Sequence, residues 1–66
     1  MNALAFSQET LRGLALEAKG EQAAALQHWQ TLLARSQDPL QRAQLQLALA
    51  LNHERSGELG KVFAAD

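Results

Sequence analysis

The sequence predicts an all-α protein of two stacked antiparallel helical hairpins, about four helices in all, with the last one short. Alanine and leucine each occur 13 times among the 66 residues and glutamine eight times, whereas valine occurs once and isoleucine and tyrosine are missing. These abundant residues favour helices, and strand-favouring residues are scarce. Glycine or proline separates the apolar segments. A chain of this length forms a single domain, residues 1–66.

The first helix is expected over residues 8–19, with Ser7 as its N-cap. One apolar stripe recurs at three- and four-residue spacing and consists of Leu11, Leu14, Ala15 and Ala18. Gly20 follows directly, where a residue that tolerates a left-handed conformation ends a helix. Before the cap, Leu4 and Phe6 either cover an end of the core or add a helical turn.

The second helix is expected over residues 21–35 and has the clearest amphipathic pattern in the chain. Its apolar face consists of Ala25, Leu26, Trp29, Leu32 and Leu33. We expect Trp29 to be buried between the hairpins rather than to anchor a partner. His28 lies on the polar face, so we expect a solvated surface histidine.

The third helix has the strongest start signal, because Asp38 is a favoured N-cap residue and Pro39 suits the first helical position. It is expected to end at Ser56, before Gly57. Its leucines fall on two sides, with Leu40, Leu47 and Leu51 on one and Leu45 and Leu49 nearly opposite. Such a helix should be buried on both sides. A short fourth helix over residues 58–65 presents Leu59, Val62 and Phe63.

The two halves of the chain align when Gly20 is placed over Gly57, which gives an offset of 37 residues. The first hairpin then spans residues 7–36, and the second, truncated one spans residues 38–66. A period in the thirties with two helices in each unit is typical of helical repeat proteins, because one hairpin cannot bury its own apolar faces.

The spacing of small and large residues within these units resembles that of tetratricopeptide repeats. The first unit supplies the pattern with Gly13, Leu16, Gly20, Ala25 and Trp29, and the second with Ala50, His53, Gly57 and Val62. Leu16 and His53 stand where the family has tyrosine, and the chain ends where the second unit would continue. The alternative is a bundle of three or four helices whose glycines match by coincidence.

The resemblance implies a concave groove lined by the first and third helices. Carried over position by position, its lining is Thr10, Leu14, Glu17 and Ala18 with Gln44, Leu47, Leu51, Glu54 and Arg55, and Leu59 and Phe63 add to the partner-binding set. Leu47 and Leu51 would be exposed in a monomer. Alternatively, residues 1–6 or the terminal segment fold over and cover them. The same resemblance places His53 at a helix-packing position, where a hydrogen-bonded histidine is expected.

Composition disfavours several classes of function. The formal net charge is −1 without a basic run, which disfavours nucleic acid and anionic membrane surfaces as partners. No apolar run is long enough to insert into a membrane. The chain has no cysteine, which fits a reducing, cytoplasmic location. Its two histidines form no catalytic or zinc motif, so we expect neither an enzyme nor a bound metal or cofactor.

The function we expect is that of a protein-interaction module, an adaptor or a small chaperone-like protein, that binds a partner helix or peptide in the apolar groove. The alternative is a self-associating structural protein, such as a homodimer that buries Leu59, Val62, Phe63 and the spare face of the third helix. A DNA-binding helix-turn-helix regulator is disfavoured by the few, scattered basic residues.

Overall fold

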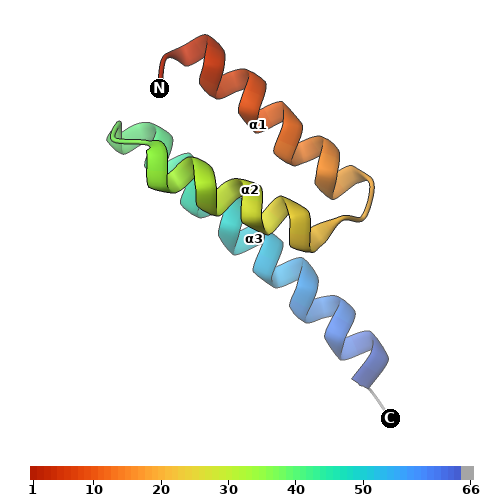
Figure 1. The fold of residues 1–66 in the computed structure, drawn as a ribbon. Helices are drawn as coiled ribbons and strands as arrows, with labels where there is room; N and C mark the ends of the chain where they lie inside the picture. Colours follow the sequence, from red (N-terminus) through yellow and green to blue (C-terminus); the bar gives the residue numbers. More distant parts are fainter. Residues whose placement is uncertain (65–66) are drawn as a thin grey trace.

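Three helices make up the part of the chain that the computed structural model describes, namely the backbone of residues 1–64 and the side chains of residues 1–55. They are α1 (Ala3–Ala18), α2 (Gln22–Arg35) and α3 (Pro39–Ala64), and this part contains no strand. Figure 1 shows α2 running back along α1, and α3 reversing again to run in the direction of α1. The all-α class is therefore confirmed, whereas the arrangement of four helices in two hairpins is not.

Helix α1 begins five residues earlier than the sequence predicts. The side chain of Asn2 caps it by accepting a hydrogen bond from the backbone amide of Ala5 at 2.8 Å, so the prediction of Ser7 as the cap is wrong. The earlier start places Phe6 inside the helix with its side chain in the core. Burial of that phenyl ring favours the longer helix. The extra turn leaves Leu4 exposed.

The turn between α1 and α2 is the one that the sequence predicts at Gly20. This residue has a φ of 82°, which only glycine adopts without strain. Its amide donates to the carbonyl oxygen of Glu17 and the amide of Glu21 donates to that of Leu16, both at 2.9 Å. This pair of bonds satisfies two carbonyl groups at the end of α1 and turns the chain directly into α2.

Helix α2 is the central helix and packs on both of its neighbours. Ala25, Trp29 and Leu32 are buried as predicted, and they form the core with Phe6 of α1 and Leu45 of α3. Gly13 is buried against the indole ring of Trp29. A Cβ atom at Gly13 would lie closer than 3.0 Å to three atoms of that ring. The absence of a side chain at Gly13 therefore lets α2 approach α1 closely.

Helix α3 continues without interruption through Gly57, so the predicted break there and the fourth helix over residues 58–65 are both wrong. A glycine costs a helix interior only about 1 kcal/mol relative to alanine, too little to force a turn by itself. The second hairpin, residues 38–66, consequently does not form. In Figure 1 the last turns of α3 extend beyond the ends of α1 and α2. The side chains of Leu59, Val62 and Phe63 lie outside the described residues.

The two leucine sides of α3 have different environments. Leu45 is buried against α2 and Leu49 is half-buried, whereas Leu40, Leu47 and Leu51 are exposed. The expectation of burial on both sides is thus wrong for the single chain. Three helices provide only one apolar surface for α3 to pack on, which leaves its second apolar side open.

The start of α3 gives a first testable prediction. The Asp38 carboxylate accepts from the amides of Leu40 at 2.8 Å and Gln41 at 3.2 Å, which confirms the predicted cap. Replacing Asp38 by alanine should lower the free energy of unfolding by about 1 kcal/mol, because both amides lose their acceptor. Urea unfolding at a fixed protein concentration measures this loss. Gln37→Ala, outside the helix, is the control and should leave the midpoint unchanged.

Candidate functional site

The large exposed apolar side chains of the described residues are all leucines, and none of them lies on α2. Each is between 43% and 70% exposed. They are Leu4, Leu11 and Leu14 on α1, and Leu40, Leu47 and Leu51 on α3. We call these six residues the leucine face. Because isolated exposed leucines are ordinary but a contiguous group is not, their mutual arrangement decides whether they form a site.

Contacts near both ends of α1 hold it beside α3. The side-chain amide of Gln41 donates to the carbonyl oxygen of Met1 at 3.0 Å, and that of Asn52 donates to the Glu17 carboxylate at 3.4 Å. Between these contacts lies a shallow groove. Its lining, from both helices, is Phe6, Ser7, Thr10, Leu11 and Gln44. The two helices therefore meet at these two contacts and along the groove between them.

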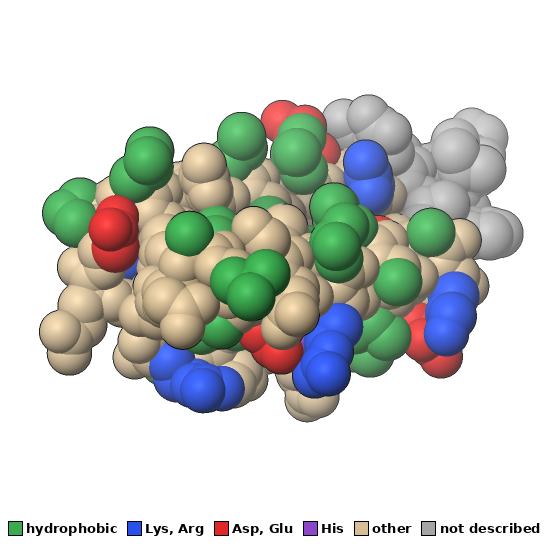
Figure 2. Space-filling view, turned by 90° about the horizontal axis from the view of Figure 1, so that it is seen from above, with side chains coloured by type: hydrophobic (Ala, Val, Ile, Leu, Met, Phe, Trp, Pro, Cys, Tyr) green, Lys and Arg blue, Asp and Glu red, His purple; other side chains and the backbone are tan. Residues whose placement is uncertain are grey.

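Helical spacing places several of the leucines beside this groove. Leu14 lies one turn from Thr10 and one from Glu17, which both face α3. Leu47 and Leu51 continue a row at four-residue spacing that ends at Arg55, which pairs with Glu17. Leu14, Leu47 and Leu51 are thus placed beside the groove that Leu11 lines. Figure 2 shows hydrophobic side chains spread over this view with polar atoms between them, while most Lys and Arg side chains lie in its lower half.

A polar cluster closes one end of the groove. The Nδ2 atom of Asn52 donates to the carbonyl oxygen of Gln22 at 3.2 Å and to its side-chain oxygen at 3.0 Å, in addition to Glu17. Asn52 is 2% exposed, and it joins all three helices. The Arg55 guanidinium lies 3.7 Å from the Glu17 carboxylate. This cluster sets the position of α3 relative to α1.

The residues predicted for partner binding separate into three groups. Leu14, Gln44, Leu47 and Leu51 are exposed on or beside the groove; Thr10 lines it and is partly exposed, and Ala18 and Glu54 are also exposed. Glu17 is largely buried and serves the polar cluster, together with Arg55. The side chains of Leu59 and Phe63 lie outside the described residues.

Three residues of the leucine face are not among the partner-binding positions that the sequence predicts. Leu4, Leu11 and Leu40 are exposed beside the predicted positions. A signal for them exists, since Leu4 and Leu11 are seven residues apart and so are Leu40 and Leu47. This spacing returns side chains to the same side of a helix after two turns and is typical of helices that pack against one another.

The structure corrects the expectations for both histidines. His28 is half-buried, with its Nε2 atom 2.6 Å from the carbonyl oxygen of Glu9 and 3.7 Å from the carboxylate of that residue. It therefore links α2 to α1 rather than facing solvent. His53 is exposed and does not occupy a helix-packing position. The two rings consequently do not contribute to a common site.

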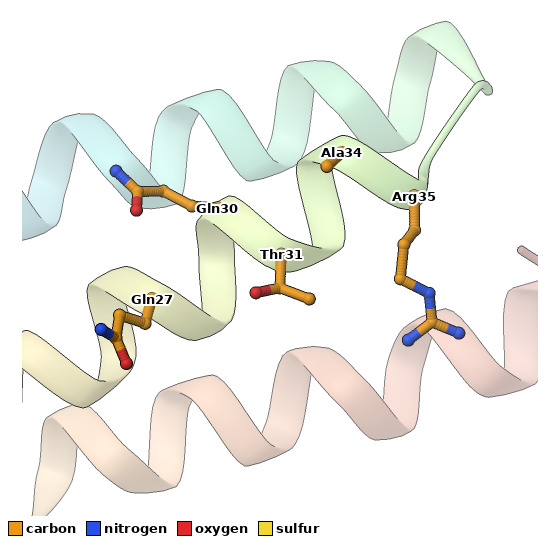
Figure 3. Close-up of a pocket in the computed structure, with 5 residues that line it drawn as sticks. All are labelled: Gln27, Gln30, Thr31, Ala34 and Arg35. Carbon is orange, nitrogen blue, oxygen red and sulfur yellow. The ribbon is translucent and has the colours of Figure 1, made fainter.

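The outer side of α2 has a different character from the leucine face. A shallow depression there is lined by Gln27, Gln30, Thr31, Ala34 and Arg35 (Figure 3). These side chains are polar or small, and all five residues are exposed. Up to residue 55, where side chains are described, no group of three or more His, Asp or Glu residues is placed to hold a metal ion. No helix in the described part combines the length and apolar character needed to cross a membrane.

Comparisons with protein-family models, with curated proteins and with solved structures found no match for this chain. The leucine face is therefore interpreted from its own chemistry.

Proposed function

We propose that this chain is a protein-interaction module that binds an amphipathic helix of a protein partner on the leucine face. The supporting observations are that the six large exposed apolar side chains of the described residues lie on α1 and α3, and that one of them, Leu11, lines a shallow groove between these helices. Contiguous exposed apolar surface on a small protein is typical of an interaction site. An apolar groove between two helices accepts a third helix through residues at three-, four- and seven-residue spacing.

The character of the groove favours a helix over other ligands. Its lining combines the apolar Phe6 and Leu11 with the uncharged polar residues Ser7, Thr10 and Gln44. Such a lining suits the apolar side of an amphipathic helix and offers little to a charged small molecule. The resemblance to tetratricopeptide repeats supports the same class of function, with an adaptor or small chaperone-like protein as the corresponding cellular role.

A synthetic amphipathic helix tests this proposal. The probe is a peptide with leucines at heptad positions a and d and with alanine and glutamine elsewhere, added to a dilute solution of the chain. We expect the amide signals of Leu14, Leu47 and Leu51 to shift in nuclear magnetic resonance spectra. Leu47→Glu should weaken binding by about 10-fold or more, because a buried leucine contributes about 1.5–3 kcal/mol.

The matched control for this test is Gln30→Glu, which adds the same charge to the outer side of α2. It should bind the peptide as the unmodified chain does. Circular dichroism must show that Leu47→Glu remains helical. If that variant unfolds, Leu47 belongs to the core and the leucine face is not the site. Peptide shifts confined to Gln27, Gln30 and Thr31 would contradict the proposal as well.

A further inference from the structure

We infer that the occupant of the leucine face is a second copy of this chain, so that the protein forms a two-fold symmetric dimer through α1 and α3. This inference rests on the proposed function, because it names the partner helices for the same surface. It commits to one geometry, in which the leucine face of one copy meets that of the other. The four helices α1 and α3 of the two copies then form the centre, and both α2 helices lie outside.

The exposed area of the chain is the first argument. A compact protein of 7.2 kDa exposes about 4,100 Å², whereas this chain exposes 4767 Å². The surplus of about 650 Å² is close to the roughly 800 Å² that each partner contributes to a standard interface. The radius of gyration is 12.9 Å, compared with about 11 Å for a compact chain of this length. The single chain is therefore more open than a compact protein of its size; part of this excess comes from the end of α3, which extends beyond α1 and α2 (Figure 1), and the six exposed leucines supply apolar area for an interface.

The charge of the leucine face is the second argument. Between the leucines the surface presents Ser7, Thr10 and Gln44, which are neutral. At the end of the groove, Glu17 and Arg55 pair with each other within the chain. A surface adapted to an acidic or basic partner would carry groups of the opposite sign around its rim. The groove itself is neutral, so two copies can meet there without repulsion between like charges, which a two-fold interface requires; the exposed Glu54 lies beside Arg55 at its end.

The spacing of the leucines is the third argument. Leu4 and Leu11 on α1, and Leu40 and Leu47 on α3, repeat at seven residues. Helices with this repeat pack at a shallow crossing angle, with the side chains of one helix between those of the other. Both α1 and α3 have this seven-residue repeat, so each copy presents two rows of leucines that can pack against those of the second copy. The polar outer side of α2 (Figure 3) would remain in solvent, as its exposed glutamines suit.

The test is sedimentation of the full chain over a range of concentrations. We expect a dimer that dissociates on dilution, with a mass that falls from twice 7.2 kDa toward 7.2 kDa. Leu11→Glu and Leu47→Glu should each sediment as helical monomers at concentrations where Gln30→Glu remains dimeric. A monomer at every concentration overturns the inference. If one leucine variant unfolds, the other decides, and unfolding of both overturns the inference because it makes these leucines core residues.

A cross-linking experiment checks the geometry independently. The chain has no cysteine, so a single introduced thiol is the only one present. With a short bis-maleimide reagent, Ser7→Cys on the groove should give covalent dimers, and Gln30→Cys on α2 should not. Dimers that cross-link only through Gln30→Cys would overturn this arrangement. If the chain is a monomer that still binds the amphipathic peptide, the proposed function stands and the dimer is rejected. If it is a monomer that does not bind the peptide, the proposed function and the dimer are both rejected.

Discussion

Replacing Gly13 by leucine should destabilise the fold by about 2 kcal/mol. The new side chain would begin at a Cβ atom that already overlaps three atoms of the Trp29 ring. Overpacking of this kind costs about 1–3 kcal/mol, and occasionally more, because the buried ring must move or the helices must separate. Leucine is a better helix former than glycine by nearly 1 kcal/mol, which offsets part of the loss. Urea unfolding at a fixed protein concentration gives the net change.

Two further variants assign this effect to the contact with Trp29. Ala15→Leu adds the same kind of side chain at an exposed position of α1 and should leave the stability nearly unchanged. Trp29→Leu alone should destabilise by leaving a cavity, but it should reduce the penalty of Gly13→Leu when the two are combined. That coupling is expected because the substitutions share one contact. A stabilised Gly13→Leu variant would mean that α1 and α2 do not approach closely here.

The parts of this fold that the sequence predicts well are those set by local chemistry. The left-handed turn at Gly20, the cap at Asp38 and the buried face around Trp29 each follow from a few neighbouring residues. The start of α1 was less predictable, since Asn2 and Ser7 are both good caps. The start at Asn2 is favoured because it places Phe6 inside the helix with its side chain buried in the core. That burial depends on contacts distant in the sequence, so it could not be predicted from neighbouring residues.

The candidate site was predictable only in part for a related reason. Helical periodicity identifies which leucines share a side of α3, but it does not say which side finds a partner. The structure places Leu45 against α2 and leaves Leu47 exposed. The sequence also predicts a helix end at Gly57 that the structure does not have, because a glycine permits a turn without requiring one. The second hairpin was therefore predicted where a continuous helix lies.

One buried amide contributes strongly to the position of α3 relative to α1. Asn52 is 2% exposed, and its Nδ2 atom has acceptors on Gln22 and Glu17, so it links α3 to the start of α2 and the end of α1. Apolar contacts alone would tolerate a shift of α3 along its axis, because leucine and alanine recur along it. A directional hydrogen bond at a single position fixes the alignment, as buried polar groups do in some helical assemblies.

Asn52→Ala should therefore destabilise the chain by about 2 kcal/mol, since part-buried acceptors on Glu17 and Gln22 lose a donor. Gln46→Ala, at an exposed position of the same helix, is the control and should have little effect. In combination with Gln22→Ala, the loss should be less than additive, because the two side chains share a hydrogen bond.

If Asn52 also aligns the leucine face, Asn52→Ala should weaken dimerisation although residue 52 is buried and cannot contact the second copy. Sedimentation under conditions where the variant is fully folded separates these two effects, and unchanged dimerisation would restrict Asn52 to a role in stability.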